Sequence, residues 1–370
     1  MTNRECCVLI PSLEPDEKLP QYVKKLLAAD FGMILVIDDG SGPSYQPIFE
    51  DIAGWKRCTV LHHEVNRGKG AALRTGYSHI LEKTAIKGVI TADSDGQHTV
   101  EDTTLLAERL TDDQEELLLG SRDFSRKSKQ VPPKSRFGNR LTSAIFGLLY
   151  GHFLPDTQTG LRGMNRQMLN DCLKITGDRF EYEMNQLMFC AMNHIPMVVV
   201  PIKTVYMNEN QGTHFHPIRD SWRIYKLILG NFFKFMSASL ICWVVDIGLF
   251  TLLKGVEPLA RLEMETPWLR ALSRSTEAIL LATVIARVVS ATINFVLNKN
   301  IVFNMKKCKG AVWRYIILCV AVMLVSGVVV SAFHDLLNIN SSFIKIVVDL
   351  ILFVINYRIQ RNWVFKPANK

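Results

Sequence analysis

Residues 89–98 read Val-Ile-Thr-Ala-Asp-Ser-Asp-Gly-Gln-His, a short apolar run that ends in carboxylates. Residues 34–41 have the same pattern, Ile-Leu-Val-Ile-Asp-Asp-Gly-Ser. Apolar runs of this length that stop at Asp and Gly are typical of buried strands followed by a turn. The two stretches therefore indicate a sheet whose strand ends carry acidic groups.

Further apolar runs alternate with helix-like stretches along the first third of the chain. We predict strands at 7–10, 34–37, 59–61, 89–92 and 117–119. This alternation predicts an α/β domain with a Rossmann-like, largely parallel sheet. Because such sheets bind ligands at the carboxyl ends of their strands, the residues that follow each run are the candidate functional residues.

The strongest candidate site is the acidic group after residue 92. Asp93 and Asp95 are spaced so that extended backbone would point both carboxylates to one side, next to the amide oxygen of Gln97. Such hard oxygen donors suit Mg²⁺ or Mn²⁺, which would bridge to phosphate oxygens. A lone Asp-x-Asp also occurs in ordinary turns, but a second acidic strand end at Asp38 and Asp39 favours a metal or sugar-nucleotide site.

A glycine-rich loop, Asn66-Arg67-Gly68-Lys69-Gly70, lies between the two acidic strand ends. Its glycines would let backbone N–H groups approach a phosphate at the start of a helix near Ala71, where Lys69 adds positive charge. The loop lacks the glycine, Lys and Ser/Thr spacing of a Walker motif.

Together these segments resemble the family 2 glycosyltransferases of GT-A fold, and within them the dolichol/polyprenyl-phosphate hexose synthases. The other segments that carry the resemblance are Gly120-Ser121-Arg122, Asp156-Thr157-Gln158-Thr159-Gly160-Leu161-Arg162, Phe180-Glu181-Tyr182-Glu183 and the stretch 214–223. The resemblance covers about residues 5–225. It implies an inverting, metal-dependent transfer of a hexose from a UDP- or GDP-sugar to undecaprenyl or dolichyl phosphate, in cell-envelope glycan synthesis or modification.

The resemblance also implies roles for single residues. Asp93 and Asp95 would be the catalytic pair and would hold Mg²⁺ or Mn²⁺ together with Gln97. The nucleotide sugar would contact Pro11, Glu14, Asp38, Asp39, Lys69, Asp93, Ser94 and Thr159, and the acceptor phosphate would contact Arg122, Arg136 and Arg140. Where the family usually has Pro-x-Tyr-Asn, this chain has Pro11-Ser12-Leu13-Glu14-Pro15. The base is therefore left open.

Several of these segments also have simpler interpretations. The basic stretch 122–140 has the composition of a solvated or lipid-attracted loop as well as of a phosphate site. Thr157 to Gly160 also fits a polar turn. Glu181 and Glu183 would stabilise the start of a helix at 181–193 whatever their function. We expect His98 beside the metal rather than on it.

The C-terminal part of the chain is apolar enough to enter a membrane. We predict spans at about 232–253, 276–297, 315–334 and 339–357, each near the length that crosses a bilayer. The expected domains are a cytosolic enzyme (1–213), an interfacial juxtamembrane helix (214–231) and a membrane domain (232–370). The loop 298–314 has five basic and no acidic residues, which predicts cytoplasmic termini in the cytoplasmic membrane.

The membrane part contains a repeat, because residues 294–303 match residues 356–365 in character at eight of ten positions. It resembles GtrA-like four-helix domains, which the resemblance associates with moving polyprenyl-phosphate sugars. Three charges lie inside the spans, Asp246, Arg287 and Asp349. We expect Arg287 to pair with Asp349 or with Asp246, either to hold the bundle together or to take a lipid phosphate.

Two other functions stay open, a transporter or flippase and a processive polysaccharide synthase, although the chain has no Gln-x-x-Arg-Trp motif. A homo-oligomer through the membrane domain is also open, and we expect no nucleic-acid partner. The eight cysteines form no Cys-x-x-Cys pair, which favours reduced thiols over a zinc site or disulfides.

Overall fold

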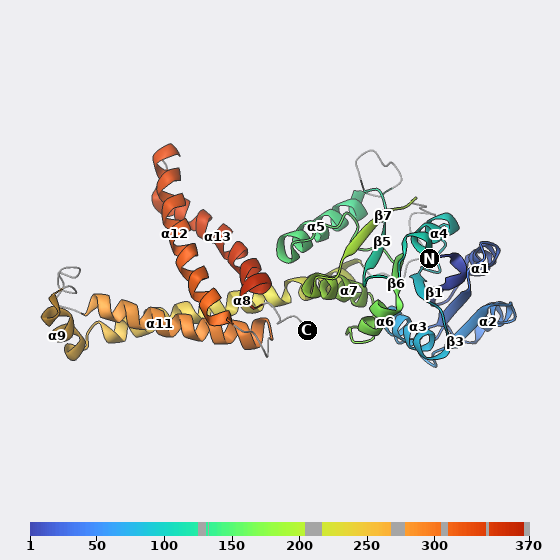
Figure 1. Ribbon diagram of the computed structural model, residues 1–370, viewed down its shortest axis with the longest axis horizontal. Coiled ribbons are helices and arrows are strands. Elements are labelled where there is room, and N and C mark those ends of the chain that lie inside the picture. The colour runs from blue at the N-terminus through green and yellow to red at the C-terminus, as the bar shows by residue number, and fades with distance from the viewer. Residues whose placement is uncertain are drawn as a thin grey trace. The chain divides into compact units, whose positions relative to one another are not determined.

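The computed structural model of the chain describes residues 1–124, 131, 133–203, 217–267, 278–304, 310–337 and 340–365. The chain forms two compact units, Met1–Ile228 and Leu229–Lys370, both drawn in Figure 1. The division falls inside the segment 214–231 that the sequence assigns to an interfacial helix. Residues 214–216 of that segment lie outside the described residues.

The N-terminal unit is built on one mixed seven-stranded sheet in the order β3-β2-β1-β4-β6-β5-β7. The strands are β1 (Cys6–Ser12), β2 (Met33–Asp38), β3 (Cys58–His62), β4 (Gly88–Thr91), β5 (Leu117–Ser121), β6 (Arg162–Asn165) and β7 (Met197–Pro201). Strand β6 is antiparallel to both of its neighbours, and every other pairing is parallel. The predicted α/β fold with a largely parallel sheet is therefore confirmed.

All five predicted strands are present, and two further strands were not predicted. β7 reads Met-Val-Val-Val-Pro, a β-branched run that carries the usual strand signal. β6 reads Arg-Gly-Met-Asn and has no β-branched residue. Its extended form is imposed by pairing on both sides with β4 and β5, which local sequence does not reveal.

Helices cover both faces of this sheet. The helices of the unit are α1 (Lys18–Ala28), α2 (Gln46–Ala53), α3 (Lys69–Lys83), α4 (Val100–Arg109), α5 (Pro133–Tyr150), α6 (Arg166–Cys172) and α7 (Glu181–Asn193). Apolar residues of α1, α2 and α4 form one core with alternate residues of β1 and β2. Helix α3 packs on β1 and β2 and against α6 and α7. Strands buried on both faces explain the continuous apolar runs in the sequence.

Helix α8 (Pro217–Leu253) is continuous through the boundary between the two units. The expected interfacial helix and the first expected span are therefore one helix, which runs through Gly230 at the expected boundary and has no Pro after Pro217 to interrupt it. In the first unit its start packs on α5, where the hydroxyls of Thr142 and Tyr225 lie 3.3 Å apart.

The second unit is helical. Besides the rest of α8 it contains α9 (Glu257–Glu265), α11 (Ile279–Leu297), α12 (Ala311–Leu337) and α13 (Ser341–Ile359). Among the described residues, three helices are long and apolar enough to cross a membrane, at Trp222–Leu253, Ile279–Val302 and Ala311–Phe333. The fourth expected span corresponds to α13, which carries Lys345, Asp349 and Arg358 along its 19 residues. A fourth crossing stays a prediction.

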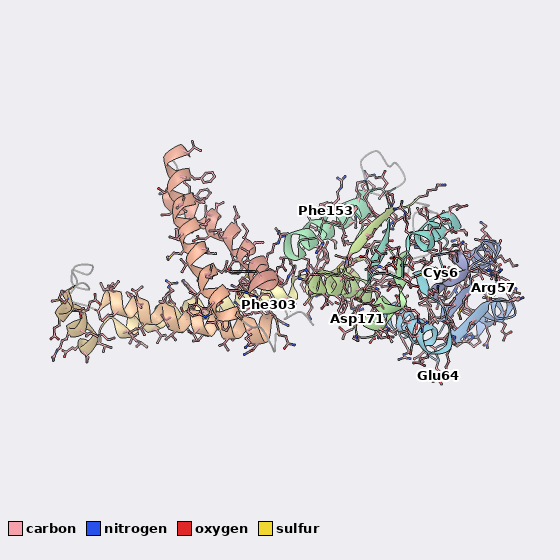
Figure 2. All side chains as sticks on the ribbon, in the orientation of Figure 1. Cys6, Arg57, Glu64, Phe153, Asp171 and Phe303 are labelled. Atoms are coloured by element: carbon pink, nitrogen blue, oxygen red, sulfur yellow. The ribbon has the colours of Figure 1, made fainter. Side chains whose placement is uncertain are left out.

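The predicted repeat is visible in the fold of this unit. Helices α11 and α13 each continue into a five-residue π-helical turn, η4 (Asn298–Val302) and η5 (Gln360–Val364). Equivalent residues of the two copies meet each other, since Asn298 Nδ2 donates to Gln360 Oε1 at 3.0 Å and the rings of Phe303 and Phe365 stack at 5.2 Å. Figure 2 labels Phe303 at this end of the unit.

The contacts between the copies are also reciprocal. Phe235 packs on Tyr357 with ring centroids 5.3 Å apart, and Tyr315 packs on Phe295 at the same separation. Phe235 corresponds to Tyr315 in the repeat, and Tyr357 corresponds to Phe295. The two hairpins, α8 with α11 and α12 with α13, are thus related by an internal pseudo-two-fold axis.

Candidate functional site

The candidate residues of the first unit gather at one edge of the sheet. The parallel strands β1, β2, β4 and β5 end there at Ser12, Asp38, Thr91 and Ser121. Because β6 runs in the opposite direction, its beginning lies at the same edge, and the turn before Arg162 comes next to Asp93. The sheet therefore brings together four of the segments that the sequence singles out.

Asp93 is held between two basic side chains. Its Oδ1 lies 2.6 Å from Lys69 Nζ, and its Oδ2 lies 3.4 Å from His98 Nε2. Lys69 also bridges to Glu183 Oε1 at 2.9 Å and is only 15% exposed. Burial alone would raise the pKa of Asp93, but Lys69 and His98 outweigh it and hold that pKa well below its usual value.

Within the described part of the chain, no basic side chain lies within ion-pair distance of Asp95, and Lys69 and His98 act on it only from farther away. Its Oδ1 accepts the backbone N–H of Gln97 at 3.0 Å, within a turn at residues 94–95. Burial and the charge of Asp93 raise its pKa above the usual value. The backbone here is a turn rather than the extended segment that the sequence suggests. The two carboxylates still repel each other, so a cation bound between them would be stabilised by both charges.

Gly160 allows the turn at residues 156–160 to lie directly against Asp93. A Cβ at Gly160 would come within 2.4 Å of Asp93 Oδ2, so no larger residue fits beside this carboxylate. The Gly160 carbonyl accepts a hydrogen bond from Thr91 at 2.8 Å, which ties the turn to the end of β4. The turn therefore forms one wall of the acidic site.

The two acids after β2 have structural contacts on every oxygen. Asp39 accepts the backbone N–H groups of Arg67 and Gly68 at 3.0 and 2.7 Å, and its Oδ1 lies 2.7 Å from His63 Nδ1. Asp38 accepts the N–H of Ser41 at 2.9 Å. Asp39, whose side chain is 6% exposed, therefore fixes the loop at 66–70. Its contact with a nucleoside stays a prediction.

This arrangement corrects our interpretation of the glycine-rich loop. Two of its N–H groups donate to Asp39, and the N–H of Ala71 donates to the carbonyl of Asp178. A Cβ at Gly68 would lie 2.3 Å from that same carbonyl, so the glycine permits close approach of protein backbone rather than of a phosphate. The part of the loop that reaches the acidic site is the Lys69 side chain.

Arg122 follows β5 at the same edge and is oriented by a buried carboxylate. Its Nε and Nη2 donate to the two oxygens of Asp156 at 2.7 and 3.1 Å. The Asp156 side chain is fully buried, and the guanidinium also covers the ring of Phe124. Only part of the charge of Arg122 is therefore left for an acceptor phosphate.

The other two predicted arginines lie on α5 and donate to backbone carbonyls of residues before that helix. Arg136 Nη2 donates to the carbonyl of Val131 at 3.3 Å, and Arg140 Nη2 donates to that of Phe124 at 3.4 Å. A shared anion site at the three arginines stays a prediction. The cations at 126, 127 and 129 lie outside the described residues.

The remaining predicted contacts have mixed outcomes. Thr159 is buried and hydrogen-bonds within its own turn, accepting the N–H of Leu161 at 3.3 Å. Pro11 is buried, whereas Ser94 is partly exposed and Glu14 exposed. The sequence did not decide whether Glu183 stabilises the start of a helix or belongs to the site. Its ion pair with Lys69 places it in the site, while Glu181 accepts the N–H groups of Asp178 and Arg179 at the helix start.

The charges in the membrane unit form pairs within each hairpin. Arg287 Nη2 lies 3.2 Å from Asp246 Oδ2, and Ser290 donates to Asp246 at 3.0 Å. Asp349 pairs with Lys345 at 2.9 Å and accepts from Ser326 at 2.7 Å. Of the two pairings expected for Arg287, the one with Asp246 is correct and the one with Asp349 of the same chain is wrong.

The donor set at Asp93 and Asp95 fits a divalent cation that takes part of its shell from a ligand. No group of three or more His, Cys, Asp or Glu in the described part of the chain could hold a metal without other donors. The expected donors for Mg²⁺ or Mn²⁺ shared with a diphosphate are carboxylates and other hard oxygens. Asp93 and Asp95 supply two carboxylates, and Asp95 has no ion-pair partner in the described part of the chain.

Comparison with known proteins finds a family match in each unit. Residues 7–173 match Glycosyl transferase family 2, and residues 234–365 match the GtrA/DPMS transmembrane domain. A UDP-N-acetylglucosamine--dolichyl-phosphate N-acetylglucosaminyltransferase of Methanococcus voltae is 27% identical over 56% of this chain and 88% of its own length. Glycosyltransferase AglJ of Haloferax volcanii is 26% identical, covering 59% of this chain and 69% of that protein.

Among solved structures, glucosyl-3-phosphoglycerate synthase from Mycobacterium tuberculosis, in complex with Mn²⁺, uridine-diphosphate and phosphoglyceric acid, is 17% identical with a TM-score of 0.45. The similarity covers 61% of this chain and 77% of that chain.

Proposed function

We propose that this chain, which combines a family 2 glycosyltransferase domain with a GtrA/DPMS transmembrane domain, transfers a hexose from a nucleotide sugar to a polyprenyl phosphate. The observation that carries the proposal is the meeting of Asp93, Asp95, Lys69 and Glu183 at the sheet edge where Arg122 also lies. A divalent cation and diphosphate fit the first group, and an acceptor phosphate fits the arginines.

This chemistry requires no general base. A phosphate monoester has its second pKa at about 6, so the acceptor is already an anion at neutral pH. The protein must instead hold two phosphate groups close together and stabilise the leaving diphosphate. Lys69, beside Asp93, and the arginines at 122, 136 and 140 supply positive charge for those tasks.

We assign the bound cation to Asp93, Asp95 and Gln97, with His98 and Lys69 positioning Asp93. When bound, Mg²⁺ or Mn²⁺ would neutralise charge that develops on the leaving diphosphate. The relatives named for dolichyl-phosphate transfer support a polyprenyl phosphate acceptor. The positive-inside pattern supports a cytoplasmic location for the catalytic unit and both termini.

The test is transfer of radiolabelled sugar by the purified full-length protein. A panel of UDP- and GDP-hexoses should be offered with undecaprenyl or dolichyl phosphate and with Mg²⁺ or Mn²⁺, and label should pass to the lipid with one donor. Nucleotide-sugar binding without any transfer would favour the transporter alternative. A labelled polymer would favour the processive synthase.

Removing the charge of Lys69 should change how the site binds metal. In the Lys69→Met variant, Asp93 and Glu183 lose their common cationic partner, which competes with a metal for the Asp93 carboxylate. Mn²⁺ without nucleotide should therefore bind about 10-fold more tightly, because a change of one pKa unit in a carboxylate corresponds to a factor of ten. Electron paramagnetic resonance of free Mn²⁺ measures this directly. Lys69→Arg, which keeps the charge, is the matched control, and unchanged Mn²⁺ affinity in Lys69→Met would contradict the assignment.

Arg136 should affect the acceptor and not the donor. Arg136→Ala should raise the polyprenyl phosphate concentration needed for half-maximal rate by about 10-fold, because a charge-assisted hydrogen bond to phosphate is lost. The value for the nucleotide sugar should stay near that of the wild type. Arg109→Ala, at an exposed position of α4, controls for the loss of one positive charge. Equal weakening of both substrates would show that Arg136 serves the fold or the donor.

A further inference from the structure

The two hairpins of the membrane unit carry opposite charges at matching depth. Arg287 lies eleven residues before Asn298, and Asp349 lies eleven before Gln360. Because Asn298 and Gln360 hydrogen-bond to each other, α11 and α13 share a level at that end. Eleven residues of helix rise about 16 Å, close to half the thickness of the hydrocarbon core. Both charges therefore lie near mid-depth of a bilayer.

These charges are exposed on the surface of a single chain. The Arg287 side chain is 72% exposed even though it pairs with Asp246. The side chains of Asp349 and Lys345 are 48% and 57% exposed. Charged groups inside a membrane are costly to expose to lipid and face protein or water-filled interiors instead. The described residues of one copy do not supply such surroundings for these groups.

The helices around them are also poorly covered. No more than 17% of the apolar core of any of the three candidate spans is buried. Among the described residues, the ring contacts between the hairpins cluster at the end marked by Phe303 and Phe365. Figure 1 shows the α12–α13 hairpin separating from α8 and α11 away from that end. Each hairpin thus has a free face that includes a charge at mid-depth.

We propose that the membrane unit is completed by a second copy of this chain, with Arg287 of one copy paired to Asp349 of the other. The charges are opposite, and a two-fold axis along the bilayer normal keeps every residue at its own depth. In such an isologous contact each pairing occurs twice, so the two copies would make two equal Arg287–Asp349 pairs. Asp246 and Lys345 would complete a neutral network. This inference does not depend on the proposed transferase chemistry.

The depth of the charges distinguishes this partner from a lipid headgroup. The phosphate of a resting lipid lies at the membrane surface, whereas Arg287 is about 16 Å along its helix from the level of Asn298. A second copy supplies a carboxylate at the right depth without moving any group across the membrane. A bound lipid phosphate or a different protein is therefore an alternative outcome of the test.

Charge reversal in two differently tagged full-length copies gives the test. Arg287→Asp expressed alone places like charges opposite each other, as does Asp349→Arg alone, so co-purification of the two tags in nanodiscs should fall at least 10-fold in each case. When one copy carries Arg287→Asp and the other Asp349→Arg, one of the two contacts pairs opposite charges with reversed sign, and the other is the native pair of Arg287 with Asp349. Co-purification should then return to within about twofold of the wild type.

The control is Arg261→Asp, which reverses an exposed charge on α9 and should leave co-purification unchanged. Since Arg287→Asp also removes the pair with Asp246, a second measurement uses an intact pair: a photo-crosslinker at the exposed Val288 should attach to the region around Asp349 of the other copy. Failure of the mixed pair to recover, or crosslinks to lipid or to another protein alone, would overturn the proposal.

Discussion

An Asp95→Asn variant should transfer sugar at least about 100-fold more slowly than the wild type while keeping its fold. The change preserves the size of the side chain and its acceptor for the N–H of Gln97, but it removes one of the two carboxylates assigned to the cation. Loss of one group that stabilises charge on the leaving diphosphate is expected to cost about this factor. Initial rates at saturating donor and acceptor measure it.

Stability should change in the opposite direction, which separates a functional role from a structural one. In the metal-free protein the charge of Asp95 is destabilised by burial and by Asp93, which is why its pKa is raised. Replacing it by a neutral amide should therefore leave the thermal unfolding midpoint unchanged or raise it. The added Mn²⁺ that stabilises the wild type should stabilise the variant less. Asp51→Asn, at an exposed position of α2, is the matched control. Near-normal transfer by Asp95→Asn would remove this residue from the site.

The sheet and its functional edge were predictable because the signals are local. A strand buried on both faces must be apolar throughout, and the chain must turn where it ends, so residues 34–41 and 89–98 reveal strand and strand end together. The same locality explains why β6 was missed. Its four residues have no strand propensity and become a strand only through partners on both sides.

Contacts between distant segments were the part of the site that the sequence could not supply. The pairing of Glu183 with Lys69 joins residues more than a hundred positions apart, and nothing in either segment indicates it. The contacts of Asp39 with the loop at 66–70 were missed for a related reason. An acid at a strand end looks the same in sequence whether it meets a ligand or the N–H groups of a neighbouring loop. Only burial and the occupancy of both oxygens distinguish the two.

The membrane repeat was predictable from sequence for a different reason. Duplicated hairpins keep equivalent residues at equivalent places, so Asn298 and Gln360 could be aligned without knowing that they touch. The expected pairing of Arg287 with Asp349 in one chain was wrong because a carboxylate on the neighbouring helix of the same hairpin lies closer to Arg287. Asp246 lies on α8, next to α11, and reaches Arg287 there.

The Arg122→Ala variant should be strongly destabilised, because it leaves Asp156 fully buried without its cation. Removing one partner of a buried ion pair costs about 3 to 5 kcal/mol, far more than the pair contributes when intact. Chemical denaturation of the full-length protein in detergent, followed by a signal from the first unit, measures the loss. Arg122→Lys should recover only part of it, since an ammonium lacks the planar fork by which Nε and Nη2 of Arg122 meet the two oxygens of Asp156.

The double variant Arg122→Ala with Asp156→Asn separates the structural role of Arg122 from its proposed role at the acceptor. A neutral amide at 156 removes the uncompensated charge and can still accept the N–H of Gln158, so most of the lost stability should return. The requirement for polyprenyl phosphate should stay raised, because the guanidinium that would meet the acceptor is still missing. If stability and acceptor affinity recover together, Arg122 acts only through the fold, and the acceptor phosphate must be held by Arg136 and Arg140 alone.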